Sequence, residues 1–251
     1  MCSSDLIEAV ARIKSEIVSS LAADGTAVLN ADDPRVAAMA SLAPGRVITY
    51  GTSENAEVHM AVVDTDDRGR VTARFARGDA YVSTELEHPG EHMAMNAAAA
   101  VAVGVAAGVP FADAVDALHR ADHAPMRMEW STAPDGTRVL DDSYNANSSS
   151  MEAALRTLAS APAAHRFAVL GAIAEVSDPG SVHARVASLA SDLGIVLVPL
   201  ETDLYGPPGL TLEGALAAVR PRGADTVVLV KGSRAAHAER AVWGLLDPRG
   251  S

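Results

Sequence analysis

The sequence predicts an α/β protein of two domains: a mixed sheet with an antiparallel insert, then a Rossmann-like domain with a mainly parallel sheet. Short apolar strands alternate with amphipathic helices after about residue 125, which is typical of a parallel sheet covered on both faces. Residues 57–88 instead contain three β-rich segments separated by short turns, which is typical of antiparallel strands. Only 4% of the 251 residues are aromatic, so Ala, Val and Leu must form the cores.

The first domain is expected over residues 1–124. Hydrophobic spacing, proline and glycine positions define its elements. In chain order they are a helix over 5–21, a strand over 25–30, a helix over 34–42, a strand over 46–51, antiparallel strands over 57–88, an Ala-rich helix over 90–108 and a helix over 110–120.

Pro125 interrupts the pattern, and the second domain is expected over residues 125–251. We expect this domain to fold by itself. Its predicted elements are strands over 128–132 and 137–141, a helix over 148–160, a strand over 166–170, a helix over 181–192, a strand over 195–198, a helix over 211–219, a strand over 226–230 and a helix over 235–246.

Composition excludes several classes of protein. The net charge of −12 repels polyphosphate backbones, and few aromatic residues are available to stack on bases. No apolar run reaches the ~18 residues that a membrane helix needs. The single cysteine, Cys2, allows no internal disulfide. We therefore expect a cytoplasmic protein without a nucleic-acid partner and without membrane insertion.

The basic residues are unevenly chosen. Of the 20, only Lys14 and Lys231 are lysine, and the rest are arginine. A lysine can supply a neutral amine or a compact point charge, which arginine cannot. Both lysines are therefore candidates for function, although chance retention in an Arg-biased sequence explains either one equally well.

Several strands are predicted to end in polar or glycine-containing turns, and the richest of these is "DDSYNANSSSM" at 141–151. Ligands of open parallel sheets bind beyond the carboxyl ends of the strands. Residues 147–150 are explained as turn and helix-cap residues. Asp142, Tyr144 and Asn145 are not needed for a turn, which makes them candidates for ligand binding.

This turn resembles a signature of the Mur ligases, and seven further segments resemble the same family in the same order. These segments are "ARIKSEI", "GTAVLNADDP", "GEHMAMNAAAA", "APMRMEW", "FAVLGAIAEV", "HARVA" and "VLVKGSR". The resemblance spans residues 7–246. It implies a partial central ATPase domain followed by the family's C-terminal domain.

The resemblance also implies a reaction and its ligands. With "DDSYNAN" and "KGSR" together, it favours members that add D-alanyl-D-alanine to a UDP-N-acetylmuramoyl tripeptide in peptidoglycan synthesis. ATP and Mg²⁺ are the implied cofactors, and an acyl phosphate is the implied intermediate. A related muramoyl or folate-type ligase is one alternative. A non-catalytic module that binds nucleotide or dipeptide is the other.

The nucleotide and metal residues follow from the same resemblance. Lys14 matches a catalytic lysine that the family carbamylates to make a metal ligand. Asn96 is expected at the adenine. Arg127 is expected at the ATP phosphates from a hinge between the domains. Asp142 is expected at the ribose hydroxyls, and Asn145 lies in the same turn.

The remaining matches concern the acceptor substrate. Lys231, Ser233 and Arg234 form the "KGSR" turn, and they are expected to contact the incoming substrate. His183 matches a histidine for which capping or packing is as good an explanation as catalysis.

The sequence contains no G-x-x-x-x-G-K-[ST] phosphate-binding loop. We therefore expect an N-terminally truncated fragment, inactive by itself, in which residues 1–6 are a non-native start. The full-length protein is expected to be a monomer, whereas an uncovered sheet edge is expected to make the fragment self-associate.

Overall fold

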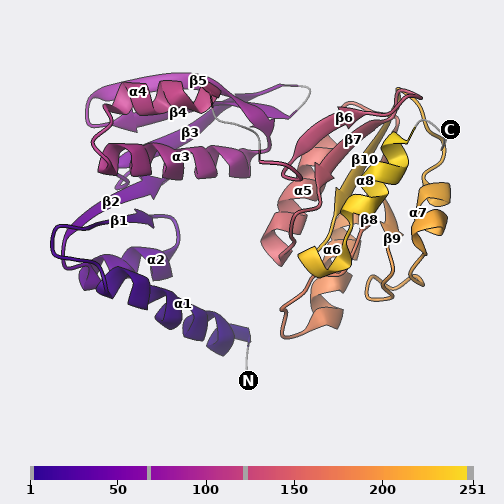
Figure 1. The fold of residues 1–251 in the computed structure, drawn as a ribbon, viewed down its shortest axis with the longest axis horizontal. Coiled ribbons are helices and arrows are strands. Elements are labelled where there is room, and N and C mark those ends of the chain that lie inside the picture. The colour runs from indigo at the N-terminus through magenta and orange to yellow at the C-terminus, as the bar shows by residue number, and fades with distance from the viewer. Residues whose placement is uncertain (1–2, 67–68, 121–123, 248–251) are drawn as a thin grey trace. The chain divides into compact units, whose positions relative to one another are not determined.

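The computed structural model describes residues 3–66, 69–120 and 124–247. The chain forms two compact units that divide near residue 121, each with its own sheet and core (Figure 1). Met1 and Cys2, with which the expected non-native start begins, lie outside the described residues. None of the described helices is long and apolar enough to cross a membrane.

The first unit contains a five-stranded mixed sheet in the order β1-β2-β3-β4-β5. β1 pairs with β2, and β2 with β3, in parallel, while β3 and β4 pair antiparallel. The strands are β1 (Thr26–Asn30), β2 (Arg46–Gly51), β3 (Val58–Thr65), β4 (Arg70–Arg77) and β5 (Ala80–Pro89). The predicted mixed sheet is thereby confirmed.

The helices of the first unit differ in how far their apolar side chains are buried. They are α1 (Ser3–Ser19), α2 (Pro34–Ala38), η1 (Met39–Leu42), α3 (Glu91–Ala106), α4 (Phe111–Asp116) and η2 (Ala117–Arg120). Small residues of α3, including Ala94, Ala98 and Ala102, are fully buried in the core that this helix shares with the strands. Side chains this small let a helix approach a sheet closely. α1, by contrast, leaves Ile13 and Ile17 exposed.

The second unit is a five-stranded sheet in the order β6-β7-β10-β8-β9. Only the β6–β7 pair is antiparallel, so the predicted mainly parallel sheet is confirmed. The strands are β6 (Glu129–Thr132), β7 (Arg138–Asp142), β8 (His165–Leu170), β9 (Val196–Pro199) and β10 (Thr226–Lys231). The helices are α5 (Ser148–Ser160), α6 (Pro179–Asp192), α7 (Leu212–Ala218), η3 (Arg234–Ala236) and α8 (Glu239–Leu246).

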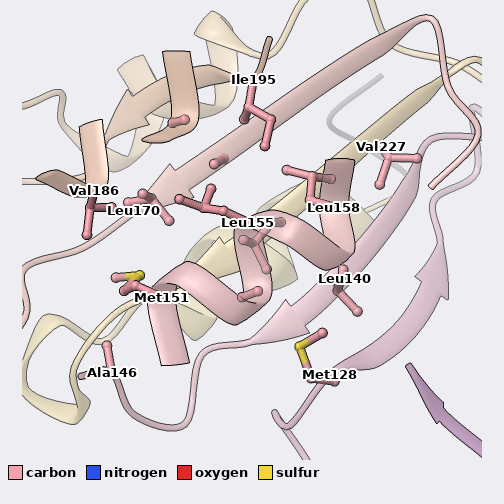
Figure 2. Close-up of a cluster of buried hydrophobic side chains, with 14 of the residues drawn as sticks. Met128, Leu140, Ala146, Met151, Leu155, Leu158, Leu170, Val186, Ile195 and Val227 are labelled. Carbon is pink, nitrogen blue, oxygen red and sulfur yellow. The ribbon is translucent and has the colours of Figure 1, made fainter. Parts of the chain in front are cut away.

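Successive strand residues of this sheet face opposite cores, as a period of two requires. Leu140 and Leu229 join α5 and α6 in one core, whereas Val139 and Val228 join α7 and α8 in the other. Figure 2 shows the first core, in which Leu155 of α5 lies among strand side chains. Fully burying one such side chain stabilises the fold by ~1.5–3 kcal/mol.

Three predicted helices prove discontinuous. The predicted helix over 34–42 is α2 followed by the 3₁₀ turn η1, and the one over 110–120 is α4 followed by η2. The predicted helix over 235–246 is wrong at its start. There η3 ends at Ala236, the next residue His237 has a left-handed φ of 48°, and α8 begins only at Glu239. Hydrophobic spacing does not distinguish these tight turns from α-helix.

Candidate functional site

A cavity of about 540 Å³ lies beyond the carboxyl ends of β8, β9 and β10. A ligand is expected at this edge of an open parallel sheet. The walls combine small apolar side chains with a few polar groups, as small-molecule sites usually do. The lining residues are Ala172, Ala174, Leu200, Glu201, Ser233, Ala235, Ala236, His237 and Arg240.

Two glycines let the loops of the cavity approach each other. A Cβ atom on Gly171 would lie 2.6 Å from the Cβ of Ala236, and one on Gly232 would lie 3.2 Å from the same atom. The backbone N–H of Ser233 donates to the carbonyl oxygen of Ala172 over 2.9 Å. The loop after β10 is thus fixed to the loop after β8.

Arg240 is the cationic group of the cavity. It donates to a carboxylate oxygen of Glu201 over 2.7 Å and to the carbonyl oxygen of His237 over 3.0 Å. Its side chain is 36% exposed and that of Glu201 is 45% exposed. A half-exposed guanidinium can exchange one carboxylate for another, so this position suits the carboxylate of a small ligand.

His183 supports the wall of the cavity from within α6. Its ring is fully buried, and Nε2 accepts from the N–H of Ile173 over 2.9 Å while Nδ1 donates to the carbonyl oxygen of Pro179. The ring also contacts Tyr205 edge-on, and the hydroxyl of Tyr205 donates to the carbonyl oxygen of Gly171. Both nitrogens are occupied, which favours the packing role of His183 over the catalytic one.

A second cluster lies where β7 and β10 end side by side. The register pairs Asp142 with Lys231, and the ammonium of Lys231 donates to a carboxylate oxygen of Asp142. It also donates to the carbonyl oxygen of Asn145 over 2.9 Å. Asn147 caps α5 in a capping box with Ser150, as the predicted cap role of residues 147–150 requires.

Asp141, next to this cluster, is buried and accepts hydrogen bonds from the backbone and the hydroxyl of Ser143. Burial raises the pKa of Asp141 above its usual range, and the hydrogen bonds from Ser143 offset only part of that rise. The folded state thus holds this proton to higher pH than the unfolded state does.

The raised pKa of Asp141 in the folded state predicts how stability depends on pH. Because the folded-state pKa is raised, ionisation of Asp141 lowers stability as the pH rises from the ordinary aspartate range through the folded pKa. We expect Asp141→Asn to gain stability relative to the unmodified chain across that window, as measured by urea unfolding at several pH values. The exposed Asp192→Asn serves as the control. A difference that does not change with pH would contradict the assignment.

Arg127 stacks on the turn after β7. Its guanidinium carbon lies 4.3 Å from the centre of the Tyr144 ring, a cation–π distance. The N–H of Tyr144 donates to the carbonyl oxygen of Met126, and both Met126 and Met128 have positive φ values, of 61° and 54°. Such backbone strain on either side of an arginine often accompanies functional sites.

Two of the predicted site residues belong to the first unit. Lys14 is exposed on α1, and Asn96 is exposed on α3, where its amide donates to the sulfur of Met93. Among the residues that the structure describes, no three His, Cys, Asp or Glu side chains gather to hold a metal ion.

Sequence reasoning missed part of the cavity. Of the "KGSR" residues, Ser233 lines it, whereas Lys231 faces Asp142 and Arg234 pairs with Glu239. Arg240 was not predicted, because a charged residue at the start of a helix has no special pattern. Only its position, nine residues after Lys231, could have drawn attention to it.

A doubly covered parallel sheet with a ligand-sized cavity at its carboxyl edge is the architecture of many α/β enzymes that bind small molecules. The chain belongs to the Mur ligase family. The family's "Mur ligase middle domain" matches residues 5–104, and its "Mur ligase, glutamate ligase domain" matches residues 126–248.

Named relatives agree with this assignment. The chain is 36% identical over 195 residues to the UDP-N-acetylmuramoyl-tripeptide–D-alanyl-D-alanine ligase of Mycobacterium tuberculosis (strain H37Rv). That match covers 75% of this chain but only 38% of the relative. The chain thus spans well under half the length of that protein.

Solved structures share the fold. MurF from Acinetobacter baumannii superposes with a TM-score of 0.80 at 26% identity, which covers 95% of this chain and 55% of that one. MurF ligase from Thermotoga maritima, solved in complex with ADP, gives a TM-score of 0.78 at 22% identity over 94% of this chain and 56% of that one.

Proposed function

We propose that this chain forms part of an ATP-dependent ligase that adds D-alanyl-D-alanine to a UDP-N-acetylmuramoyl tripeptide during peptidoglycan synthesis. The cavity beyond β8, β9 and β10 is the observation that carries the proposal. The reaction transfers the γ-phosphoryl group of ATP to the tripeptide carboxylate. The dipeptide amine then attacks the acyl carbon, loses a proton and displaces phosphate.

The cavity suits the incoming dipeptide in shape and charge. D-alanyl-D-alanine carries two methyl groups and a terminal carboxylate. Ala172, Ala174 and Ala236 offer an apolar wall for the methyl groups. Arg240 offers a guanidinium for the carboxylate, which would replace Glu201 as its partner.

The turn after β7 suits the nucleotide. We infer that Asp142 accepts hydrogen bonds from the ribose hydroxyls and that Asn145 assists in the same turn. Arg127 would exchange its stacking contact with Tyr144 for a phosphate. Asn96 stays the proposed contact of the adenine.

The described residues do not form a complete site for the Mg²⁺ that the family implies, because they contain no cluster of three His, Cys, Asp or Glu side chains. We propose only that the exposed Lys14 is open to carbamylation, which would give it one anionic ligand oxygen. Other parts of the enzyme would have to supply the remaining ligands.

Titration calorimetry with D-alanyl-D-alanine tests the proposal directly on this chain. Arg240→Gln should weaken binding by about 10- to 100-fold, since a hydrogen bond to a charged group contributes ~1.5–3 kcal/mol. Arg156→Gln, on the exposed face of α5, should leave binding unchanged.

Stereochemistry provides a second control. L-alanyl-L-alanine has the same charge and composition, yet its methyl groups would point away from the alanine wall. Equal binding of both dipeptides, no binding of either, or an unaltered affinity in Arg240→Gln would each count against the proposed function.

A further inference from the structure

Lys231 is one of only two lysines, and it is 1% exposed at the end of the central strand β10. Removing an ammonium from water costs several kcal/mol unless partners compensate. Its Nζ reaches Asp142 Oδ2 at 2.5 Å, the Asn145 carbonyl at 2.9 Å and the Asp142 carbonyl at 3.5 Å. Two of the acceptors belong to Asp142, the last residue of β7, and the third belongs to the turn that follows it.

We propose that Lys231 is a positioning residue that sets the conformation of the turn 142–147 and does not contact the substrate. The ammonium donates to Oδ2 of Asp142. Oδ1 of the same carboxylate is then the oxygen that we propose for a ribose hydroxyl group. The ammonium of Lys231 also donates to the carbonyl oxygen of Asn145, and this hydrogen bond fixes the middle of the turn. The consequence for nucleotide binding rests on the function proposed above, whereas the control of the turn does not.

The geometry explains why this position is lysine in a chain that otherwise uses arginine. A compact ammonium has three donors, and three acceptors surround it within 3.5 Å. A guanidinium is planar and wider, with five donors in a fixed fork. It would leave buried donors unpaired in this space.

The test compares Lys231→Met, Asp142→Asn and the double variant. Each single variant leaves one member of the pair buried without its partner, so each should lower the urea midpoint of the second unit. The double variant removes both charges and should recover much of the midpoint. It therefore provides a folded sample even if the single variants unfold.

Hydrogen exchange by mass spectrometry then separates positioning from stability. In the double variant, amides of residues 142–147 should exchange about tenfold faster than in the unmodified chain, while those of β8 stay protected. Exchange in the turn at the unmodified rate would overturn the proposal, because it would show that the turn holds its shape without Lys231.

Ligand titration measures affinities for ADP and for D-alanyl-D-alanine, which a purely structural role of Lys231 would not change selectively. The double variant also lacks the Asp142 carboxylate, so Lys231→Met is the informative sample. It should weaken ADP binding by about tenfold and leave D-alanyl-D-alanine binding within about twofold. A loss confined to the dipeptide would instead make Lys231 a substrate contact. If the unmodified chain binds neither ligand, the proposed function fails, and the exchange experiment still decides the role of Lys231.

Discussion

Replacing Leu155 with alanine is expected to lower the free energy of unfolding of the second unit by about 2–5 kcal/mol. Leu155 is fully buried in α5, where it packs in the core against the strands (Figure 2). Truncation removes apolar surface from the core and leaves a cavity that a helix anchored at both ends cannot close. Urea unfolding followed by tryptophan fluorescence measures the loss.

Fluorescence reports this unit selectively, because Trp130 and Trp243, the only two tryptophans in the sequence, both belong to it. Leu204→Ala is the matched control. Its side chain is 39% exposed, so the change should stay within about 0.5 kcal/mol. Equal effects of the two substitutions would show that the core is not packed as described.

His183→Ala is expected to destabilise the second unit by about 3 kcal/mol and to deform the cavity. The substitution leaves the N–H of Ile173 without its acceptor and removes the ring N–H from the carbonyl of Pro179. A buried polar group without a partner costs ~1–3 kcal/mol, and the lost ring volume adds to this. The loop that carries Ala172 and Ala174 should then lose order.

His183→Gln distinguishes the contributions. A glutamine oxygen can occupy the position of Nε2 and accept from Ile173, but it cannot also reach Pro179. We expect it to recover part of the stability and most of the dipeptide affinity, as shown by urea unfolding and calorimetry. If His183→Ala bound the dipeptide normally, His183 would have no part in shaping the cavity.

Much of the fold was predictable because burial on both faces of a parallel sheet leaves a strong pattern. Strands such as β8 and β10 are nearly continuous apolar runs, and α5 has both a cap at Asn147 and a helical apolar stripe. The interrupted helix near His237 was not predictable, since a left-handed residue without glycine carries no compositional signal.

The candidate site was predictable where polar residues follow a strand, and not where burial changes their role. Asp142 and Asn145 stay predictions, which rest on there being more polar residues after β7 than a turn needs. Lys231 was expected at the substrate, yet the register of β7 and β10 places Asp142 beside it. That register depends on the pairing of strands almost 90 residues apart in the chain, and a local motif does not contain it.

The strand order determines how freely the loops around each proposed ligand site can change in sequence. β10 lies between β7, which leads into the turn proposed for the nucleotide, and β8, which with β9 carries two walls of the cavity. Under the proposed function, substitutions in the loops after β8 and β9 can therefore change which acceptor binds without altering the turn proposed for the nucleotide. The segment that runs from the end of β10 into α8 lacks this freedom, because Lys231 at its start pairs with Asp142 and Arg240 near its end lines the cavity. The proposed function therefore predicts that acceptor specificity among related ligases evolves mainly in the loops after β8 and β9.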